Sequence, residues 1–286
     1  MTVDENRATN LIDLHCHLLP GIDDGSKDLA MSLAMARMAS ADGISTIACT
    51  PHILPGIYNN SGPAIRKAVA RLAESIAEAG IPISLVTGAD VHIACDLAVQ
   101  LRDGRALTLN GSRYLLLEPP HHVLPPRLED LIFGLQTAGY VPILTHPERL
   151  SWLEGHYDLV RRLVSSSVLM QITAGSVMGR FGRRPCYWAE RMLDEGLCHL
   201  LATDAHNTEQ RAPRMAEARD FVAQRLGDDE AINLVLRRPQ GILNNLSPAE
   251  LPPLPRAKAW QQASGSEAPS RWSNLLKRAR WMAGAE

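Results

Sequence analysis

Short aliphatic runs alternate with longer helix-like segments along most of this chain, and this alternation constrains the fold more than any other feature. Strands that alternate with helices predict a parallel α/β fold. The runs of strand length are Leu11–Cys16, Ile44–Thr50, Ile83–Gly88, Tyr114–Glu118, Val141–Thr145, Val168–Thr173 and His199–Thr203. The helix-like segments are Leu29–Ala41, Ala64–Ala79, Arg127–Ala138, Tyr157–Ser166, Tyr187–Glu195 and Met215–Leu226.

The polar residues that follow these strands distinguish between two parallel folds. In a barrel, functional groups gather at the C-terminal ends of many strands, whereas an open sheet binds its ligand near one switch point. Nearly every strand here ends in a His, Asp or Glu, so the sequence favours the barrel. These residues are His15, His17, His52, Asp90, Glu118, His146, Asp204 and His206, with Asp23 and Asp24 in the loop after the first strand.

This set of ionisable groups predicts a metal centre. Such groups are costly to bury without partners, and metal cations would be suitable partners. Nitrogen and oxygen donors suit manganese, iron, zinc, cobalt or magnesium, and they argue against a thiolate zinc site. Eight or nine ligands exceed the need of one ion, so we expect two or three. Closely spaced ions can activate a water and clamp both oxygens of an in-line displacement, which points to phosphoester hydrolysis.

Two arginines lie close to these ligands in the sequence. Arg149 follows His146 by three positions, and Arg211 follows His206 by five. A guanidinium pairs with phosphate oxygens in a bidentate manner, so both are candidate phosphate-binding residues. The alternative for each is an ordinary surface ion pair.

The composition excludes several other classes of protein. The net charge of −2 gives no general attraction to nucleic acid, and no apolar run is long enough to span a membrane. Residues 1–10 lack the apolar core of a signal peptide, so we expect a cytoplasmic protein. The five cysteines include no Cys-x-x-Cys pair, which predicts reduced thiols rather than disulfides or a structural zinc site.

The run that begins at Asp13 and ends at Gly25, Asp-Leu-His-Cys-His-Leu-Leu-Pro-Gly-Ile-Asp-Asp-Gly, resembles the opening motif of the PHP (polymerase and histidinol phosphatase) superfamily. Its spacing is similar to that of the bacterial metal-dependent protein tyrosine phosphatases of capsule and exopolysaccharide clusters. The similarity covers roughly residues 10–245. The later motifs that match in order are Thr50-Pro-His52, Leu117-Glu118, His146-Pro-Glu-Arg149, Gln171-Ile-Thr-Ala-Gly-Ser-Val-Met-Gly179 and Thr203-Asp-Ala-His-Asn207.

This resemblance implies a distorted (β/α)7 TIM-like barrel, the PHP fold, with three metal ions that are often manganese. A metal-bound hydroxide would attack phosphorus, and tyrosine would leave. The implied substrate is the phosphotyrosine-rich tail of a bacterial tyrosine kinase that controls polysaccharide export, and Arg149 and Arg211 would hold its phosphate. The implied ligands are His15, His17, Asp24, His52, Glu118, His146, Asp204 and His206.

One position departs from the family pattern. The family usually has a glutamate that bridges two metals where this chain has Asp90, whose side chain is shorter by one methylene. This difference leaves the number of ions open. The residues six after each cysteine include no arginine, so the chain lacks the phosphate loop of cysteine-based tyrosine phosphatases.

Two other functions remain open from the sequence. One is a histidinol-phosphatase-like enzyme of the same superfamily that acts on a small molecule, and the other is a non-catalytic metal-binding regulator of a kinase. Among the remaining histidines, we expect His92 to begin a helix. We expect His121 and His122 to be solvated loop residues, with the pocket mouth or proton donation as the alternative.

The composition changes after about residue 246. We expect a phosphatase barrel over residues 1–246, a Pro-rich and polar linker over 247–270, and a basic amphipathic helix over 271–286. Such a helix can lie on an anionic membrane or contact a partner. The alternative is that it folds back on the barrel or is disordered.

Overall fold

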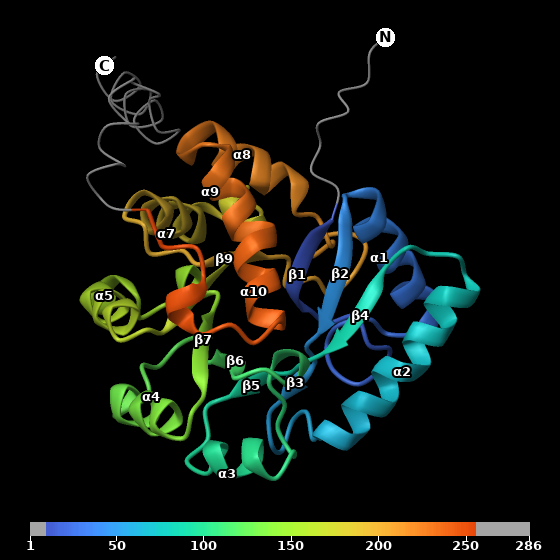
Figure 1. Cartoon of the computed structure of the whole chain (residues 1–286), viewed down its shortest axis with the longest axis horizontal. Coiled ribbons are helices and arrows are strands. Elements are labelled where there is room, and N and C mark those ends of the chain that lie inside the picture. The colour runs from blue at the N-terminus through green and yellow to red at the C-terminus, as the bar shows by residue number, and fades with distance from the viewer. Residues whose placement is uncertain (1–9, 256–286) are drawn as a thin grey trace, which may run out of the picture.

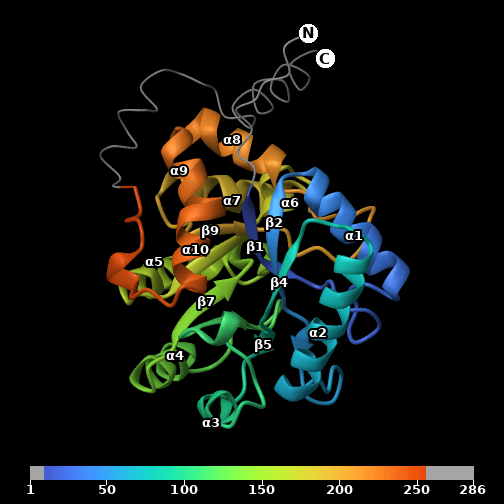
Figure 2. The same cartoon turned by 45° about the vertical axis from the view of Figure 1, so that its right-hand side comes forward.

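The computed structural model describes residues 10–255, and it has the parallel α/β architecture that the sequence predicts. The strands occupy the middle of the molecule, with α1 and α2 on one side and α4, α5 and α7 on the other (Figures 1 and 2). The strands are β1 Leu11–Cys16, β2 Ile44–Cys49, β3 His52–Ile53, β4 Ser84–Thr87, β5 Asp90–His92, β6 Tyr114–Glu118, β7 Val141–Thr145, β8 Leu169–Thr173 and β9 Leu200–Ala202.

The longer helices agree with the sequence expectation within a few residues at each end. The largest shift is at α7, which begins four residues earlier than expected. Four short helices, α3, α6, α9 and α10, were not expected. The helices are α1 Leu29–Ala41, α2 Gly62–Glu78, α3 Leu97–Arg102, α4 Leu128–Thr137, α5 Tyr157–Ser165, α6 Ala174–Val177, α7 Arg183–Asp194, α8 Ala216–Leu226, α9 Asp228–Ile232 and α10 Arg238–Leu243.

Two of the seven expected strands are each followed at once by a further short strand that was not expected. The expected strand Ile44–Thr50 is β2, and β3 begins beyond Pro51, which has no N–H to give to a ladder. The expected strand Ile83–Gly88 is β4, and β5 begins beyond Gly88, where a Cβ atom would lie 2.9 Å from Thr50 Cγ2. One sheet has the order β1-β2-β4, and β3 and β5 belong to the other, β3-β5-β6-β7-β8-β9.

Backbone contacts also bring β1, an edge strand of the three-stranded sheet, beside β9, an edge strand of the six-stranded sheet. Asp204 N donates to His15 O at 2.8 Å, and His17 N donates to Ala205 O at 2.9 Å. Only one parallel bridge, between Cys16 and Ala205, forms there in the described part of the chain. The strands therefore surround a common interior as a distorted barrel.

Alternating side chains of the strands pack into two separate apolar clusters. Leu115 and Leu117 of β6 face outward into a cluster shared with the surrounding helices. Tyr114 and Leu116 face inward into a second cluster, which includes Ile242 of α10. Because side chains two positions apart share a face, the next inward position on β6 is Glu118. The apolar interior thus gives way to polar groups at the C-terminal ends of the strands.

The buried side chain of Arg238 joins α10 to α9 and to the chain that follows α10. Arg238 is 0% exposed, and its guanidinium donates to Glu230 at 2.7 and 3.0 Å and to the Pro253 carbonyl at 2.7 Å. We expect Arg238→Met to lower the free energy of unfolding by about 3–5 kcal/mol, because Glu230 is left buried without its partner. Urea denaturation would measure this loss.

The matched control is Arg162→Met, which removes an exposed arginine from its pair with Glu129. We expect this change to leave the free energy of unfolding nearly unchanged, because solvent screens such exposed pairs. Equal losses in the two variants would contradict the assignment of a structural role to the buried pair.

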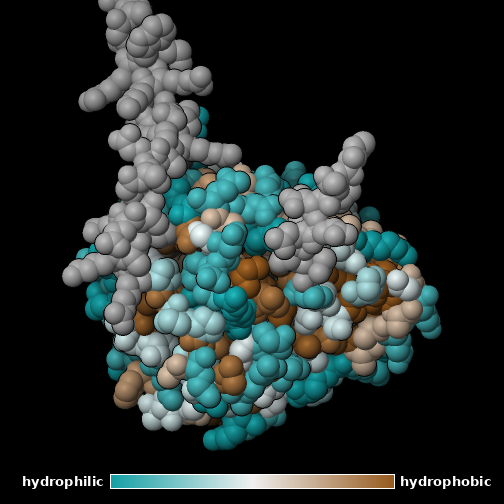
Figure 3. Space-filling model, turned by 45° about the horizontal axis from the view of Figure 1, so that its top comes forward, coloured by the Kyte–Doolittle hydropathy of each residue, from teal (hydrophilic) through white to brown (hydrophobic). Residues whose placement is uncertain are grey.

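The described part of the expected linker, residues 247–255, packs against the barrel. Leu251 is buried in the inner apolar cluster. The boundary at residue 246 stays a prediction, and the tail helix expected over 271–286 lies outside the described residues. No helix within residues 10–255 has the length and apolarity needed to cross a membrane. Hydrophilic residues cover much of the face shown in Figure 3, with apolar residues between them.

Candidate metal centre

The first strand places two buried histidines at the centre of the site. His15 Nε2 and His17 Nε2 lie 3.2 Å apart, and both residues are fully buried. Asp13 secures the neighbouring strand end, because its carboxylate accepts hydrogen bonds from the backbone N–H of Thr203 at 3.0 Å and from the Thr203 hydroxyl. This contact holds Asp204, the next residue, against the two histidines.

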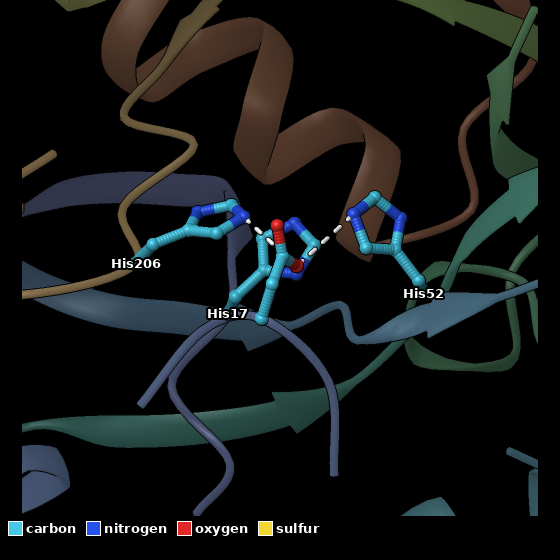
Figure 4. Close-up of side chains that lie close together, drawn as sticks. His17, His52 and His206 are labelled. Carbon is cyan, nitrogen blue, oxygen red and sulfur yellow. Dashed lines mark ion pairs between the residues drawn. The ribbon is translucent and has the colours of Figure 1, made fainter. Parts of the chain in front are cut away.

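The loop after β1 brings both of its aspartates to the histidines. Asp23 Oδ2 lies 2.7 Å from His17 Nδ1, which directs His17 Nε2 toward the interior. Asp24 Oδ1 lies 3.5 Å from His52 Nε2 and 3.4 Å from His206 Nε2. Figure 4 shows His17 between His52 and His206, with its ring centroid 4.5 and 3.9 Å from theirs.

The strands of the six-stranded sheet supply the other side of the site. Asp90 Oδ2 lies 3.4 Å from His15 Nε2 and 3.5 Å from His52 Nδ1, so this carboxylate stands between the two sheets. Glu118 Oε2 lies 3.2 Å from His52 Nδ1, and Glu118 Oε1 lies 3.5 Å from His146 Nε2. All nine ligands expected from the sequence are therefore brought together.

Two of these residues have an unusual backbone conformation. His146 has φ of 35° and Asp204 has φ of 50°, in the left-handed region that non-glycine residues seldom occupy. His146 directly follows β7, and Asp204 lies two residues after the end of β9. Such conformations persist where the surrounding structure determines them, and they are concentrated at functional sites. They turn both side chains into the cluster.

The two predicted phosphate-binding arginines converge on one carboxylate oxygen. Arg211 Nη2 lies 2.5 Å from Asp204 Oδ2, and Arg149 Nη1 contacts the same oxygen. Both guanidiniums also lie near the ring of Phe181, at 4.6 Å for Arg149 and 5.9 Å for Arg211. Their side chains are 15% and 24% exposed, so they form the solvent-facing edge of the buried cluster.

The charges of the site favour cations at its centre. Burial alone would raise the pKa of the Asp204 carboxyl, but His15 and the two arginines hold it well below its usual range. Burial alone would lower the pKa of His15, but Asp90 and Asp204 raise it to about 9. Groups that favour a proton on His15 also favour a divalent cation in the same place.

The donor atoms fit a metal centre of nitrogen and oxygen ligands. Several buried atoms make no hydrogen bond within residues 10–255, including both carboxylate oxygens of Asp90 and Nδ1 of His146. Burial lowers the pKa of His146, so its imidazole is neutral, the form that binds metals. The groups whose donor atoms lie within 4.8 Å of one another are His17–Asp24–His52–His206, His15–Asp90–His146, His15–His17–Asp204, His52–His92–Glu118 and Glu118–His121–His146.

Two histidines that the sequence analysis set aside belong to these groups. The expectation that His92 begins a helix is wrong, because its segment pairs with β6 and places His92 opposite Glu118. His121 Nε2 lies 3.2 Å from Glu118 Oε1 with its side chain 31% exposed, so this residue lines the site instead of facing solvent alone. For His92 the chain neighbourhood gave no signal of this, since its contact depends on strand pairing. For His121 the structure agrees with the alternative left open by the sequence, a place at the mouth of the pocket.

The sequence analysis also did not single out Gln171, which orients His15. Gln171 Oε1 lies 2.8 Å from His15 Nδ1 and accepts a hydrogen bond from Nδ1–H, so Nε2 keeps its lone pair for a metal. Gln171 occupies an inward position of β8, two residues after Leu169 of the inner apolar cluster. The sequence signal that could have identified Gln171 is an amide side chain at an inward-facing position of a strand.

We expect Gln171→Leu to weaken metal binding by about 10–100-fold, because His15 loses the partner that fixes its ring. Isothermal titration with manganese would measure the change. Gln136→Leu is the matched control, since Gln136 donates to the Ser166 carbonyl on the exposed surface. Unchanged manganese affinity in Gln171→Leu would contradict the orienting role.

Comparison with known proteins identifies the family of this chain. Residues 11–244 match the family model described as capsular polysaccharide synthesis, CpsB/CapC. The chain belongs to the CpsB/CapC family. The match spans every strand of the fold and all of the residues of the candidate metal centre, so family membership covers the site as well as the barrel.

Individual CpsB/CapC relatives are similar over almost their whole length. Tyrosine-protein phosphatase YwqE of Bacillus subtilis is 34% identical over 245 residues, which cover 86% of this chain and 96% of the relative. Tyrosine-protein phosphatase CpsB of Streptococcus pneumoniae is 28% identical and is covered to 98%. A chain from the crystal structures of YwqE and CpsB, described as unique metal-dependent tyrosine phosphatases, superimposes with a TM-score of 0.81 at 34% identity, covering 85% of this chain and 98% of that chain.

Proposed function

We propose that this chain is a metal-dependent protein tyrosine phosphatase that acts on a bacterial tyrosine kinase of capsular or exopolysaccharide synthesis. The observation that carries the proposal is the pair Arg149 and Arg211, which converge at the open edge of a buried nitrogen–oxygen cluster. The names of the relatives support the same activity. We place its action in the cytoplasm, where the tail of the kinase would be the partner.

The ligands in this proposal are those that the sequence predicts, and two or three divalent ions, with manganese as the first choice, would use them. When bound, these ions would activate a water nucleophile and neutralise charge on the phosphoryl oxygens. Carboxylates that face two groups of histidines suit shared ions. Glu118 is such a residue, because its two oxygens face different histidines.

The arginines supply the substrate-binding part of the site. In the described structure both guanidiniums neutralise Asp204, and their planar forks remain at the solvent-facing edge. A phosphate that enters from this edge would receive charge-assisted hydrogen bonds from both of them. Contact with Phe181 limits the movement of the two side chains, so less conformational entropy is lost when phosphate binds.

The test is phosphate release from a phosphotyrosine peptide by protein that has been stripped of metal and then resupplied with manganese. Activity that is lost on stripping and returns with manganese is the expected result. Histidinol phosphate and a phosphoserine peptide serve as comparison substrates. Faster release from histidinol phosphate would favour the small-molecule phosphoesterase, and no release from any substrate with manganese, iron, zinc or cobalt would contradict the proposal.

A further inference from the structure

His92 lies on the same face of β5 as the expected ligand Asp90, because residues two apart on a strand point the same way. Parallel pairing places Asp90 opposite His52 and His92 opposite Glu118. The pairing therefore aligns all four side chains on one face. The pairing of β3, β5 and β6 therefore brings His92 to the metal centre, although His92 is not among the ligands that the family pattern implies.

The donor atom of His92 is close to two of the expected ligands. His92 Nε2 lies 2.5 Å from Glu118 Oε2, and its ring centroid lies 5.3 Å from that of His52. Glu118 Oε2 also lies 3.2 Å from His52 Nδ1, so two imidazole nitrogens face the same carboxylate oxygen. A shared cation would satisfy the buried oxygen and both imidazoles.

His92 and Asp90 belong to different groups of donor atoms. Asp90 groups with His15 and His146, whereas the group that contains His52 and Glu118 receives its third donor from His92. Catalytic zinc sites are typically held by three protein ligands. His92, His52 and Glu118 supply that number, and Asp90 Oδ2 lies beside them, 3.5 Å from His52 Nδ1.

We infer that His92 Nε2 is a ligand of a divalent ion that it shares with His52 and Glu118. The inference deepens the proposed function, since it concerns the same metal centre. Its test measures metal binding directly, so that a negative result leaves the phosphatase proposal intact.

The first experiment compares manganese binding by the full chain and by its His92→Ala variant, using elemental analysis after dialysis and calorimetric titration. We expect the variant to bind one ion fewer, or to bind its weakest ion on the order of 100-fold less tightly. The matched control is His122→Ala, because His122 is exposed and belongs to no group of donors within residues 10–255. The control should bind manganese as the unchanged protein does.

The second experiment uses the unchanged protein and so does not depend on the folding of a variant. Anomalous diffraction from crystals grown with manganese should place an ion about 2.0–2.3 Å from His92 Nε2. An ion more than about 3 Å away would overturn the inference and leave His92 as a group that only positions Glu118. Wild-type stoichiometry and affinity in a folded His92→Ala variant would overturn it as well.

Discussion

His15→Ala is expected to remove metal from the protein and to lower kcat/KM for a phosphotyrosine peptide by about 10³-fold or more. His15 belongs to two donor groups, one with Asp90 and His146 and one with His17 and Asp204, so its loss weakens two ion sites at once. Metal ions contribute several kcal/mol of transition-state stabilisation, and each 1.36 kcal/mol corresponds to about tenfold in rate. Elemental analysis and phosphate release would measure both effects.

The matched control for this prediction is His156→Ala. His156 is exposed and contributes to no donor group in the described part of the chain. It should keep its metal content and activity. Treatment of the unchanged protein with a chelator provides a second comparison, because it should reproduce the His15→Ala defect and be reversed by manganese. Full activity in metal-free His15→Ala would contradict the assignment.

Arg149→Met and Arg211→Met are each expected to lower kcat/KM by about 10²–10³-fold while the metal content stays unchanged. Each change removes charge-assisted hydrogen bonds to the phosphoryl group, and a single such donor at a reacting oxyanion is worth about that factor. The double variant should lose less than the product of the single effects, because the two arginines act on the same group. Steady-state kinetics with a phosphotyrosine peptide would measure the losses.

Arg180→Met is the matched control for the two arginines. Arg180 precedes Phe181 in the same segment, but its guanidinium pairs with Glu217, 2.7 Å away, instead of with Asp204. It should keep nearly full activity. If the control lost as much activity as Arg149→Met, the effect would come from the segment around Phe181 and not from phosphate binding.

The main features of the fold could be predicted from the sequence. The strands Tyr114–Glu118 and Val141–Thr145 have the predicted bounds, because each is a short apolar run that ends in a polar residue. The short strands β3 and β5 could not be predicted in the same way. Gly88 was included in a strand, but the close packing of Thr50 and Leu109 against its backbone is known only from the structure.

The candidate site likewise has a part that the sequence predicts and a part that only the structure reveals. The nine ligands and two arginines were predicted because each is an ionisable residue at or near a strand end or in a motif of the resembled family. Gln171 and His92 were not predicted as site residues, and for His121 a place at the pocket mouth was only the alternative. Their roles depend on contacts with residues distant in the chain, such as the 2.8 Å contact between Gln171 and His15 across 156 positions.

The sequence by itself determined the parallel α/β class, the resemblance and the chemical identity of the donor set, because strand periodicity and residue type are local properties. Only the tertiary structure decided which donor atoms lie close enough to one another to share an ion. Strand register placed His92 opposite Glu118, and the left-handed backbone at Asp204 turned its carboxylate between the histidines and the arginines. Such distances follow from how strands pair in space, and local sequence does not encode pairing directly.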